Sequence, residues 1–195
     1  MLAALILAAG ESKRMGTPKA LLQHEGRTFL ERILEASRHP RIGVTLVVLG
    51  AHADRVHSKL PLESVTVVEN SEWKSGQLSS IQAGLRALAG QTLDGVIVFL
   101  VDHPFISSAL VGVLIERFYE SGMPIVVPTF QGKRGHPVLF SQRLFDDLLA
   151  APLDVGARAV VWQHSSEVLE VPTDEEGVVL NLNDPDALRR ALGQS

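Results

Sequence analysis

The sequence predicts an α/β fold in which a mainly parallel sheet is covered by helices on both faces. Apolar runs rich in valine, isoleucine and leucine recur along the chain, and stretches with helical spacing separate them. The predicted strands are apolar on both faces, which is typical of a parallel sheet buried between two helical layers. We therefore expect a doubly wound sheet, in which ligands bind beyond the carboxyl ends of the strands.

Strands and helices alternate regularly in the first two thirds of the chain. The predicted strands are Ala3–Ala8, Val44–Leu49, Val65–Glu69, Val96–Val101 and Ile125–Pro128. The predicted helices are Thr28–Ser37, Ala53–Leu60, Gln77–Leu88 and Ser108–Ser121. In the first helix Phe29, Ile33 and Leu34 fall at helical spacing, so this helix has one apolar face for the sheet.

The alternation breaks after Pro128, where the glycine-rich stretch Gln131–Gly135 leads into the short apolar run Pro137–Phe140. Two further helices are predicted, at Gln142–Ala150 and Gly156–His164. Residues 129–165 are therefore expected to form a small inserted cap.

The C-terminal segment is expected to return to the main sheet. Short strands are predicted at Glu167–Val171 and Val178–Leu180, and a closing helix is predicted from Asp184 to Leu192. Asp184 is expected to cap this helix, with Pro185 at its first position.

Composition sets limits on the class of protein. The 195 residues are 46% apolar and 21% charged, which is typical of a single globular domain spanning residues 1–195. The absence of cysteine excludes thiolate metal sites and cysteine nucleophiles, and it fits a reducing compartment, so we expect a cytoplasmic protein.

Charge and hydropathy also limit the partners. The net charge of −4 provides no broad basic face for nucleic acid or anionic lipid. The apolar N-terminal segment Met1–Ala9 is too short to span a membrane. We expect neither nucleic acid nor a membrane as a partner.

The loop after the first predicted strand has the features of a phosphate-binding loop. Residues 7–19 read Leu-Ala-Ala-Gly-Glu-Ser-Lys-Arg-Met-Gly-Thr-Pro-Lys. Gly10 lets the backbone approach an anion closely, and Arg14 and Lys19 supply positive charge. The Walker sequence and the glycine spacing of the dinucleotide fingerprint are both absent. A polyphosphate fits this loop; a tight turn with solvated charges is the alternative.

Six segments, in order, resemble the MobA-like nucleotidyltransferases, and in particular the molybdenum cofactor cytidylyltransferases. The first is the loop pattern Leu-Ala-x-Gly-x-x-x-Arg-Met-Gly-x-x-Lys. The others are Gly76–Ile81, Asp102-His103-Pro104, Gly135–Phe140, Gly156-Ala157-Arg158 and Asn181–Pro185. Together they cover nearly the whole chain.

This resemblance implies a Rossmann-like nucleotidyltransferase fold and a Mg²⁺-dependent reaction. CTP would lose pyrophosphate, and its CMP would join the phosphate of molybdopterin. A guanylyltransferase that uses GTP is an alternative, as is a transferase for another phosphorylated small molecule, such as a sugar phosphate or phospholactate. A molybdoenzyme or its chaperone is a possible further partner.

The resemblance also implies roles for residues of the nucleotide site. Lys19 would contact the α-phosphate and Arg14 the β- and γ-phosphates, and both are expected to be catalytic. Gln77 and Ser80 would lie at the base and sugar, although serine is also common at an ordinary helix start. The full set expected at the nucleotide is Leu7, Ala8, Ala9, Gly10, Ser12, Arg14, Lys19, Asn70, Gln77 and Ser80.

Asp102 is expected to be catalytic and to bind the metal. It follows a strongly apolar strand, where an ionised carboxylate is costly unless a metal or hydrogen bonds compensate; a turn cap is the alternative. His103 is expected in a supporting or surface role. The second metal ligand implied by the resemblance is Asn183, which stands where the family has an aspartate, and Asp184 is the fallback.

The acceptor is expected to contact His136 and Arg158, near the predicted cap. The alternatives are a structural histidine and an arginine that pairs with Asp154. At the base, relatives that transfer guanylyl groups are expected to carry glycine where this chain has Ala9. The Ala9 methyl group is therefore expected to narrow the pocket against a purine.

Two readings from other classes remain. A dinucleotide-dependent oxidoreductase is disfavoured because Leu49-Gly50-Ala51 lacks the acidic ribose ligand expected after the second strand. A non-catalytic nucleotide-binding adaptor would bind the same nucleotide without releasing pyrophosphate.

Overall fold

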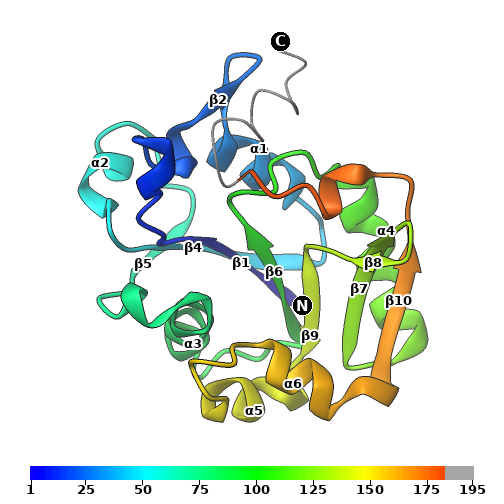
Figure 1. The fold of residues 1–195 in the computed structure, drawn as a ribbon. Helices are drawn as coiled ribbons and strands as arrows, with labels where there is room; N and C mark the ends of the chain where they lie inside the picture. The colour runs from blue at the N-terminus through cyan, green and yellow to red at the C-terminus, as the bar shows by residue number, and fades with distance from the viewer. Residues whose placement is uncertain (183–195) are drawn as a thin grey trace.

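The computed structural model describes residues 1–182, apart from the side chain of Arg14. Its main sheet has eight strands in the order β10-β7-β9-β6-β1-β4-β5, with β8 paired to β7 (Figure 1). The strands are β1 (Leu2–Ala8), β4 (Ile42–Leu49), β5 (Thr66–Glu69), β6 (Gly95–Leu100), β7 (Ile125–Phe130), β8 (Lys133–Arg134), β9 (Val138–Ser141) and β10 (Val168–Pro172). β1 is parallel to both of its neighbours, β4 and β6. The predicted mainly parallel sheet is confirmed.

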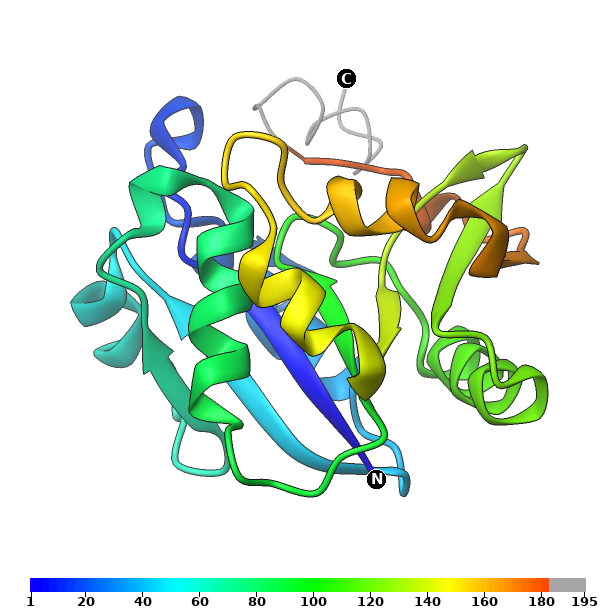
Figure 2. The same ribbon diagram turned by 90° about the horizontal axis from the view of Figure 1, so that it is seen from below.

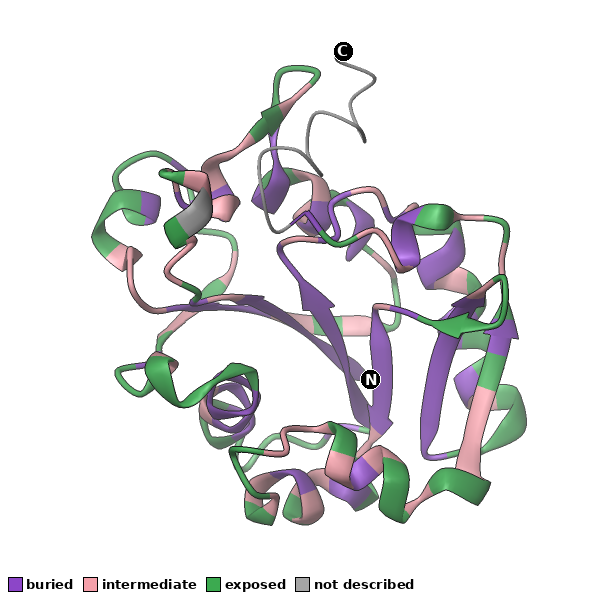
Figure 3. Ribbon diagram, in the orientation of Figure 1, coloured by how far each residue is buried: buried purple, intermediate pink, exposed green. Residues whose placement is uncertain are grey.

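Helices cover both faces of this sheet, and the central strand β1 shows why. Its residues Leu2, Ala4 and Ile6 belong to one hydrophobic core, while Ala3, Leu5 and Leu7 belong to the other. The first core includes α1 (Phe29–Ala36) and α4 (Ser108–Ser121); the second includes α3 (Gln77–Ala87), α5 (Phe145–Ala150) and α6 (Arg158–Gln163). Figure 2 looks onto the face covered by α3 and α5, and Figure 3 shows the strands β1, β6, β7 and β9 as buried.

Local sequence explains where two of the helices begin. Thr28 and Glu31 form a reciprocal cap at the start of α1: the Glu31 amide donates to Thr28 Oγ1, and the Thr28 amide donates to Glu31 Oε2. Ser107 Oγ accepts from the Leu110 amide at the start of α4, and Gly122 ends that helix with a φ of 64°. Within residues 1–182, no helix is both long and apolar enough to cross a membrane.

Part of the segment expected as a cap belongs instead to the sheet. The apolar run Pro137–Phe140 supplies β9, which pairs antiparallel with both β6 and β7. Val138 and Phe140 pack into one core and Leu139 into the other, so the run is apolar on both faces and fits a central position. Because β9 runs antiparallel, the turn that precedes it lies at the carboxyl edge of the parallel strands. α5 and α6 pack on the same face as α3.

Two local predictions are wrong, and one small hairpin was not predicted. Val178–Leu180 is not a strand: a 3-10 turn, η6 (Glu176–Val178), replaces it, because the Val178 and Val179 amides donate to the carbonyls of Glu175 and Glu176. The Val178 carbonyl accepts from the His136 amide, which ties this turn to the segment before β9. The second helix, α2 (Ala53–His57), ends before Leu60. Sequence analysis also missed the small β2–β3 hairpin (Gln23–His24 with Arg27–Thr28). The predicted closing helix lies outside the described residues.

Short 3-10 segments occupy several loops at the carboxyl edge of the sheet and beyond it. They are η1 (Lys13–Met15), η2 (Lys19–Leu21), η3 (Trp73–Ser75), η4 (Gln142–Leu144) and η5 (Ser165–Glu167). Three of them, η1, η2 and η3, carry residues of the site described next.

Candidate active site

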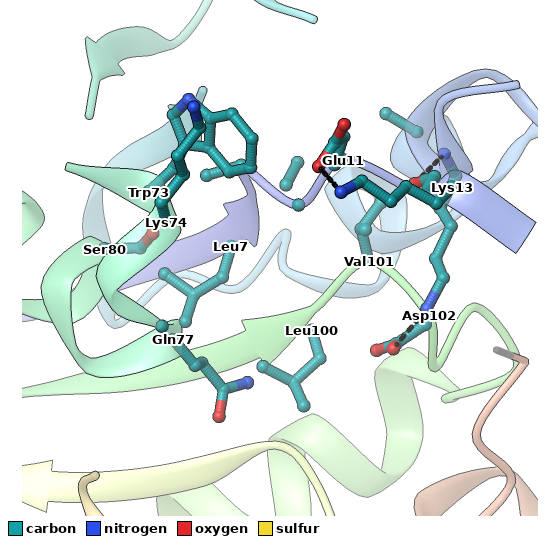
Figure 4. A pocket seen from close by; sticks show the side chains of 17 residues that line it. Leu7, Glu11, Lys13, Trp73, Lys74, Gln77, Ser80, Leu100, Val101 and Asp102 are labelled. Carbon is teal, nitrogen blue, oxygen red and sulfur yellow. Dashed lines mark hydrogen bonds and ion pairs between the residues drawn. The ribbon is translucent and has the colours of Figure 1, made fainter. Parts of the chain in front are cut away.

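A cleft of 530 Å³ opens where β1 and β6 end, between the first loop and the start of α3 (Figure 4). Its position beyond the carboxyl ends of parallel strands is the one expected for a ligand in such a sheet. The residues that line it are Leu7, Ala8, Ala9, Gly10, Glu11, Ser12, Lys13, Lys19, Ala20, Trp73, Lys74, Gly76, Gln77, Ser80, Leu100, Val101 and Asp102. Eight of the ten residues expected at the nucleotide are among them; Asn70 is not, and the side chain of Arg14 lies outside the described part of the chain.

The first loop folds back on itself through Ser12. This residue has a left-handed backbone with a φ of 53°, and its side-chain oxygen accepts from the Lys19 amide at 3.1 Å. Its carbonyl accepts from the Met15 amide at 2.9 Å, which closes η1. Ser12 therefore sets the path that carries Lys19 back to the end of β6.

Lys19 and Asp102 form an ion pair in the cleft, although they are far apart in the sequence. Lys19 Nζ lies 2.9 Å from Asp102 Oδ2, and the two side chains are only 14% and 17% exposed. The sequence placed both residues at a phosphate and metal site without indicating that they touch. The pair positions a cation and a carboxylate side by side, the combination needed to hold a phosphate and its metal ion.

Asp102 suits a metal that is shared with a substrate. Mg²⁺ is usually bound by one or two carboxylates together with substrate phosphates, and Asp102 offers such a carboxylate in the cleft. Among residues 1–182, no group of three or more histidine, aspartate or glutamate side chains could hold a metal without such a substrate. Asn183 and Asp184, the predicted second ligand and its fallback, lie outside the described residues.

The loop after β4 holds the first loop in place. The Ala51 amide donates to the Ala9 carbonyl at 3.1 Å, and His52 Nε2 donates to the Glu11 carbonyl at 2.8 Å. A Cβ atom at Gly50 would lie 2.7 Å from the Ala9 carbonyl oxygen, so only glycine permits this approach. Ala9 is 5% exposed, and its methyl group lies towards Gly50. Less of this methyl group faces the cleft than the sequence suggested.

Asn70 is buried beneath the cleft. Its Nδ2 donates to Ser79 Oγ and Ser80 Oγ at 2.9 and 3.0 Å, and its Oδ1 accepts from the Glu72 amide at 2.9 Å. The Ser79 hydroxyl donates in turn to the Gly76 carbonyl at 2.7 Å. Asn70 thus fixes η3 against the start of α3, where Ser80 lines the cleft. Its hydrogen bonds make it a positioning residue.

A second cavity, of 510 Å³, adjoins the first and shares Gly76 and Gln77 with it. β6, β7, β9 and α6 contribute its walls. Both predicted acceptor residues, His136 and Arg158, line it together with Arg134 and Trp162. Arg158 makes no ion pair with Asp154, which is also described and lines the same cavity.

His136, which lines the second cavity, lies beside the buried His103, with ring centroids 5.3 Å apart. Burial lowers the pKa of His136 to about 4, and the neighbouring His103 adds to this effect. Burial also lowers the pKa of His103, more than the nearby Asp102 carboxylate raises it. Both rings are therefore neutral at pH 7. The arginines, rather than His136, supply the positive charge of the second cavity.

Gln82 connects α3 to the wall of the second cavity. Its buried Nε2 donates to the carbonyls of Leu148 and Leu149, each at 3.1 Å, and approaches that of Ala151 at 3.4 Å. These carbonyls end α5 and begin the segment that leads to α6. One amide thus satisfies the otherwise unpaired end of α5.

Replacing Gln82 with leucine is expected to lower the free energy of unfolding by about 1–3 kcal/mol, because buried carbonyls lose their donor. For a domain of this size, that corresponds to a melting temperature lower by roughly 3–10 °C. Calorimetry would measure the shift, with the exposed Gln91→Leu as the control. A melting temperature equal to that of the control would contradict this assignment.

Among the residues that line the cavities, the sequence indicated no individual role for Trp73, Lys74, Arg134 or Trp162, and it placed Lys13 only within the loop expected to bind a polyphosphate. Lys13 pairs with Glu11 at 3.1 Å. The signal available was the position of Trp73 and Lys74 directly before the helix start at Gly76–Gln77. Because tryptophan and lysine are also common on ordinary surfaces, that position alone indicated no contact.

The fold and the cleft together define an α/β protein with a lysine from the first loop, a carboxylate at the end of the neighbouring strand, and a second cavity beside the first. Comparison with known proteins agrees. The sequence model of the family described as the MobA-like NTP transferase domain matches residues 4–168. The chain belongs to this nucleotidyltransferase family.

Curated relatives of the chain carry different names. It is 34% identical over 166 residues to nicotine blue oxidoreductase of Paenarthrobacter nicotinovorans, covering 82% of this chain and 80% of the relative. It is 32% identical over 200 residues to a molybdenum cofactor guanylyltransferase of Rhizobium meliloti, covering 96% and 89%. Sequence similarity thus shows the family, while the names of these relatives state different activities.

Among solved structures, Rv0371c from Mycobacterium tuberculosis H37Rv is similar, with a TM-score of 0.82 and 29% identity over 98% of this chain and 97% of that one. A second structure of Rv0371c, with a TM-score of 0.78 and 25% identity, covers 100% of this chain and 99% of that one, and is described as a complex with manganese. A structural relative therefore binds a divalent metal ion.

Proposed function

We propose that this protein transfers a nucleoside monophosphate from a nucleoside triphosphate to the phosphate of molybdopterin, with Mg²⁺ as the metal and CTP as the donor. The observation that carries the proposal is the pair of adjoining cavities. One contains the Lys19–Asp102 pair, and the other contains Arg158 and an aromatic side chain. The two cavities adjoin at Gly76 and Gln77, so two substrates can be bound side by side.

The reaction forms one P–O bond and breaks another. An oxygen of the acceptor phosphate attacks the α-phosphorus, and the bond from that phosphorus to the bridging oxygen breaks, releasing pyrophosphate. A phosphate is already ionised at neutral pH, so the attack needs no general base. A divalent metal would neutralise charge on the phosphates when bound, with Asp102 as its protein ligand and Asn183 as the proposed second ligand.

The protein's own contribution is to place positive charge before the reaction begins. Lys19 would stabilise the negative charge that gathers on the α-phosphate, and Arg14 would do so on the leaving pyrophosphate. The backbone of Ala8 to Gly10 would hold the nucleoside. Since Lys19 is held by both Ser12 and Asp102, little reorganisation is needed as charge develops.

The second cavity suits a flat heterocyclic acceptor that carries a phosphate. Its floor includes Leu78, Val98 and Phe140, and the exposed Trp162 lies at its side. Arg158 can bind an anion with two parallel hydrogen bonds. His136, neutral at pH 7, can offer a hydrogen bond but no charge.

GTP is the second candidate donor, because relatives such as the one from Rhizobium meliloti are named guanylyltransferases. A decisive experiment measures pyrophosphate release with molybdopterin and each of the four common ribonucleoside triphosphates. Release with CTP supports the proposal, and release only with GTP supports the second candidate. Binding without release would indicate an adaptor. Oxidation or reduction of nicotine blue without pyrophosphate release would indicate the activity named for the relative from Paenarthrobacter nicotinovorans.

Ala9→Gly is expected to lower the preference for CTP over GTP by less than tenfold, without reversing it. One methyl group contributes only about 1–3 kcal/mol to discrimination, and Ala9 is 5% exposed, so the effect falls at the lower end. The measurement is the ratio of kcat/KM for the two nucleotides in both proteins. An unchanged ratio would remove Ala9 from base selection, and a wild type that prefers GTP would overturn the cytidylyl assignment.

A further inference from the structure

Trp73 and Lys74 lie in η3, at the side of the nucleotide cleft opposite Lys13 and Asp102 (Figure 4). Trp73 is half-buried and packs against the core beneath α3, while Lys74 is exposed. Lys74 Nζ lies 5.3 Å from the centroid of the indole ring, in cation–π contact. The cleft therefore has one end with a lysine–carboxylate pair and another with an indole and a second lysine.

The indole is held in a fixed position. A Cβ atom at Gly50 would lie 2.9 Å from Trp73 Cβ and at the same distance from Ala9 Cβ, so η3 rests directly on the loops after β1 and β4. From the other side, buried Asn70 accepts from the amide that precedes Trp73, and it also holds the serines of α3. An aromatic surface fixed in this way can bind a planar group with little loss of conformational entropy.

The two ends of the cleft suit the two ends of a nucleotide. Negative phosphates belong beside Lys19 and the metal-binding Asp102, so the nucleobase extends towards η3. A base has an apolar face that stacks on aromatic rings and an edge that forms hydrogen bonds. The indole of Trp73 can stack on the face of the base, and the ammonium group of Lys74 can donate a hydrogen bond to an acceptor on its edge.

We propose that Trp73 and Lys74 recognise the nucleobase: the indole packs on its face, and Lys74 Nζ donates to a ring carbonyl. That carbonyl is O2 in cytosine or O6 in guanine. Adenine carries an amino group in place of guanine O6, so Lys74 would face a donor and disfavour ATP. This inference rests on the proposed use of a nucleoside triphosphate, and it applies equally to either donor.

Substitution of Lys74 tests the hydrogen bond. Lys74→Ala is expected to lower kcat/KM by about tenfold for whichever of CTP and GTP the enzyme uses, the effect of losing one charge-assisted hydrogen bond, and to leave kcat/KM for ATP unchanged. Lys59→Ala, an exposed lysine outside the cleft, is the matched control. If Lys74→Ala prefers CTP or GTP over ATP as strongly as Lys59→Ala does, Lys74 does not recognise the base.

The indole is tested by fluorescence, because the chain has two tryptophans and each cavity contains one of them. In Trp162→Phe the emission comes from Trp73 alone, and saturating CTP or GTP is expected to quench it. In Trp73→Phe the emission comes from Trp162, and the nucleotide alone should leave it nearly unchanged. Quenching confined to Trp162 would overturn the stacking.

Affinity provides the second measurement. Trp73→Leu is expected to weaken nucleotide binding by about tenfold, whereas Trp73→Phe keeps an aromatic face and should stay within about threefold of the wild type. Equal affinities in the two variants would contradict the stacking. Calorimetry with the wild type separates the two proposals. If no triphosphate binds, the proposed function fails. If a triphosphate binds, but Trp73 emission does not change on binding and Lys74→Ala keeps the preference over ATP, only the present inference fails.

Discussion

Lys19→Ala is expected to lower the turnover of nucleotidyl transfer by ~10²-fold, the range for removing one preorganised charge contact. The ammonium group lies 2.9 Å from Asp102 in the cleft and is held there by the loop that Ser12 closes. Its removal leaves the charge of the α-phosphate less compensated as the P–O bond forms. The measurement is kcat at saturating nucleotide and acceptor, together with the melting temperature.

The melting transition of Lys19→Ala should stay cooperative, because this side chain contributes little to the hydrophobic cores, with a somewhat lower midpoint because Asp102 loses its ion pair. Lys13→Ala is the comparison: Lys13 lines the same cleft but is 76% exposed and pairs with Glu11, so a much smaller loss is expected. Unchanged turnover in Lys19→Ala would show that Lys19 does not act on the phosphates.

Asp102→Asn is expected to lower the apparent affinity for Mg²⁺ and the rate together. The substitution keeps the size of the side chain and removes the charge that would hold the metal beside the triphosphate. Excess Mg²⁺ should recover part of the rate, since mass action overcomes weakened binding. Rates measured over a range of Mg²⁺ concentrations at saturating substrates would show a shifted midpoint.

The matched control is Asp146→Asn, an exposed carboxylate of α5 outside both cavities. It should show the rate and Mg²⁺ dependence of the wild type. If Asp102→Asn also matches the wild type, Asp102 does not hold the metal. A loss of rate that no Mg²⁺ concentration changes would likewise exclude the metal role and leave only the contact with Lys19.

The adjoining cavities give these predictions a common basis. Gln77 belongs to both cavities, Asn70 holds the start of its helix, and Gln82 ties the same helix to the wall around the second cavity. A change in α3 therefore affects both proposed substrates. Measuring KM for each substrate separately would resolve the contribution of each contact.

The sequence alone predicted the parallel strands and most of the residues that line the first cleft. Strands buried on both faces leave continuous apolar runs in the sequence. The glycine and the cations of the first loop fit a polyphosphate, and the family resemblance favoured that interpretation over an ordinary turn. Eight of the predicted nucleotide residues line one cleft because the carboxyl ends of parallel strands meet at one edge of the sheet.

Contacts between distant segments were decided only by the tertiary structure. The run Pro137–Phe140 has an apolar pattern that fits a cap or a strand, and only the space between β6 and β7 makes it β9. Asn70 was expected at the nucleotide, but its three hydrogen bonds place it beneath the cleft. Trp73 became a cleft residue through close approach to Gly50. Local sequence determines which segments become strands and helices, because periodicity acts over a few residues. Which side chains meet depends on packing across the sheet, which no short pattern encodes.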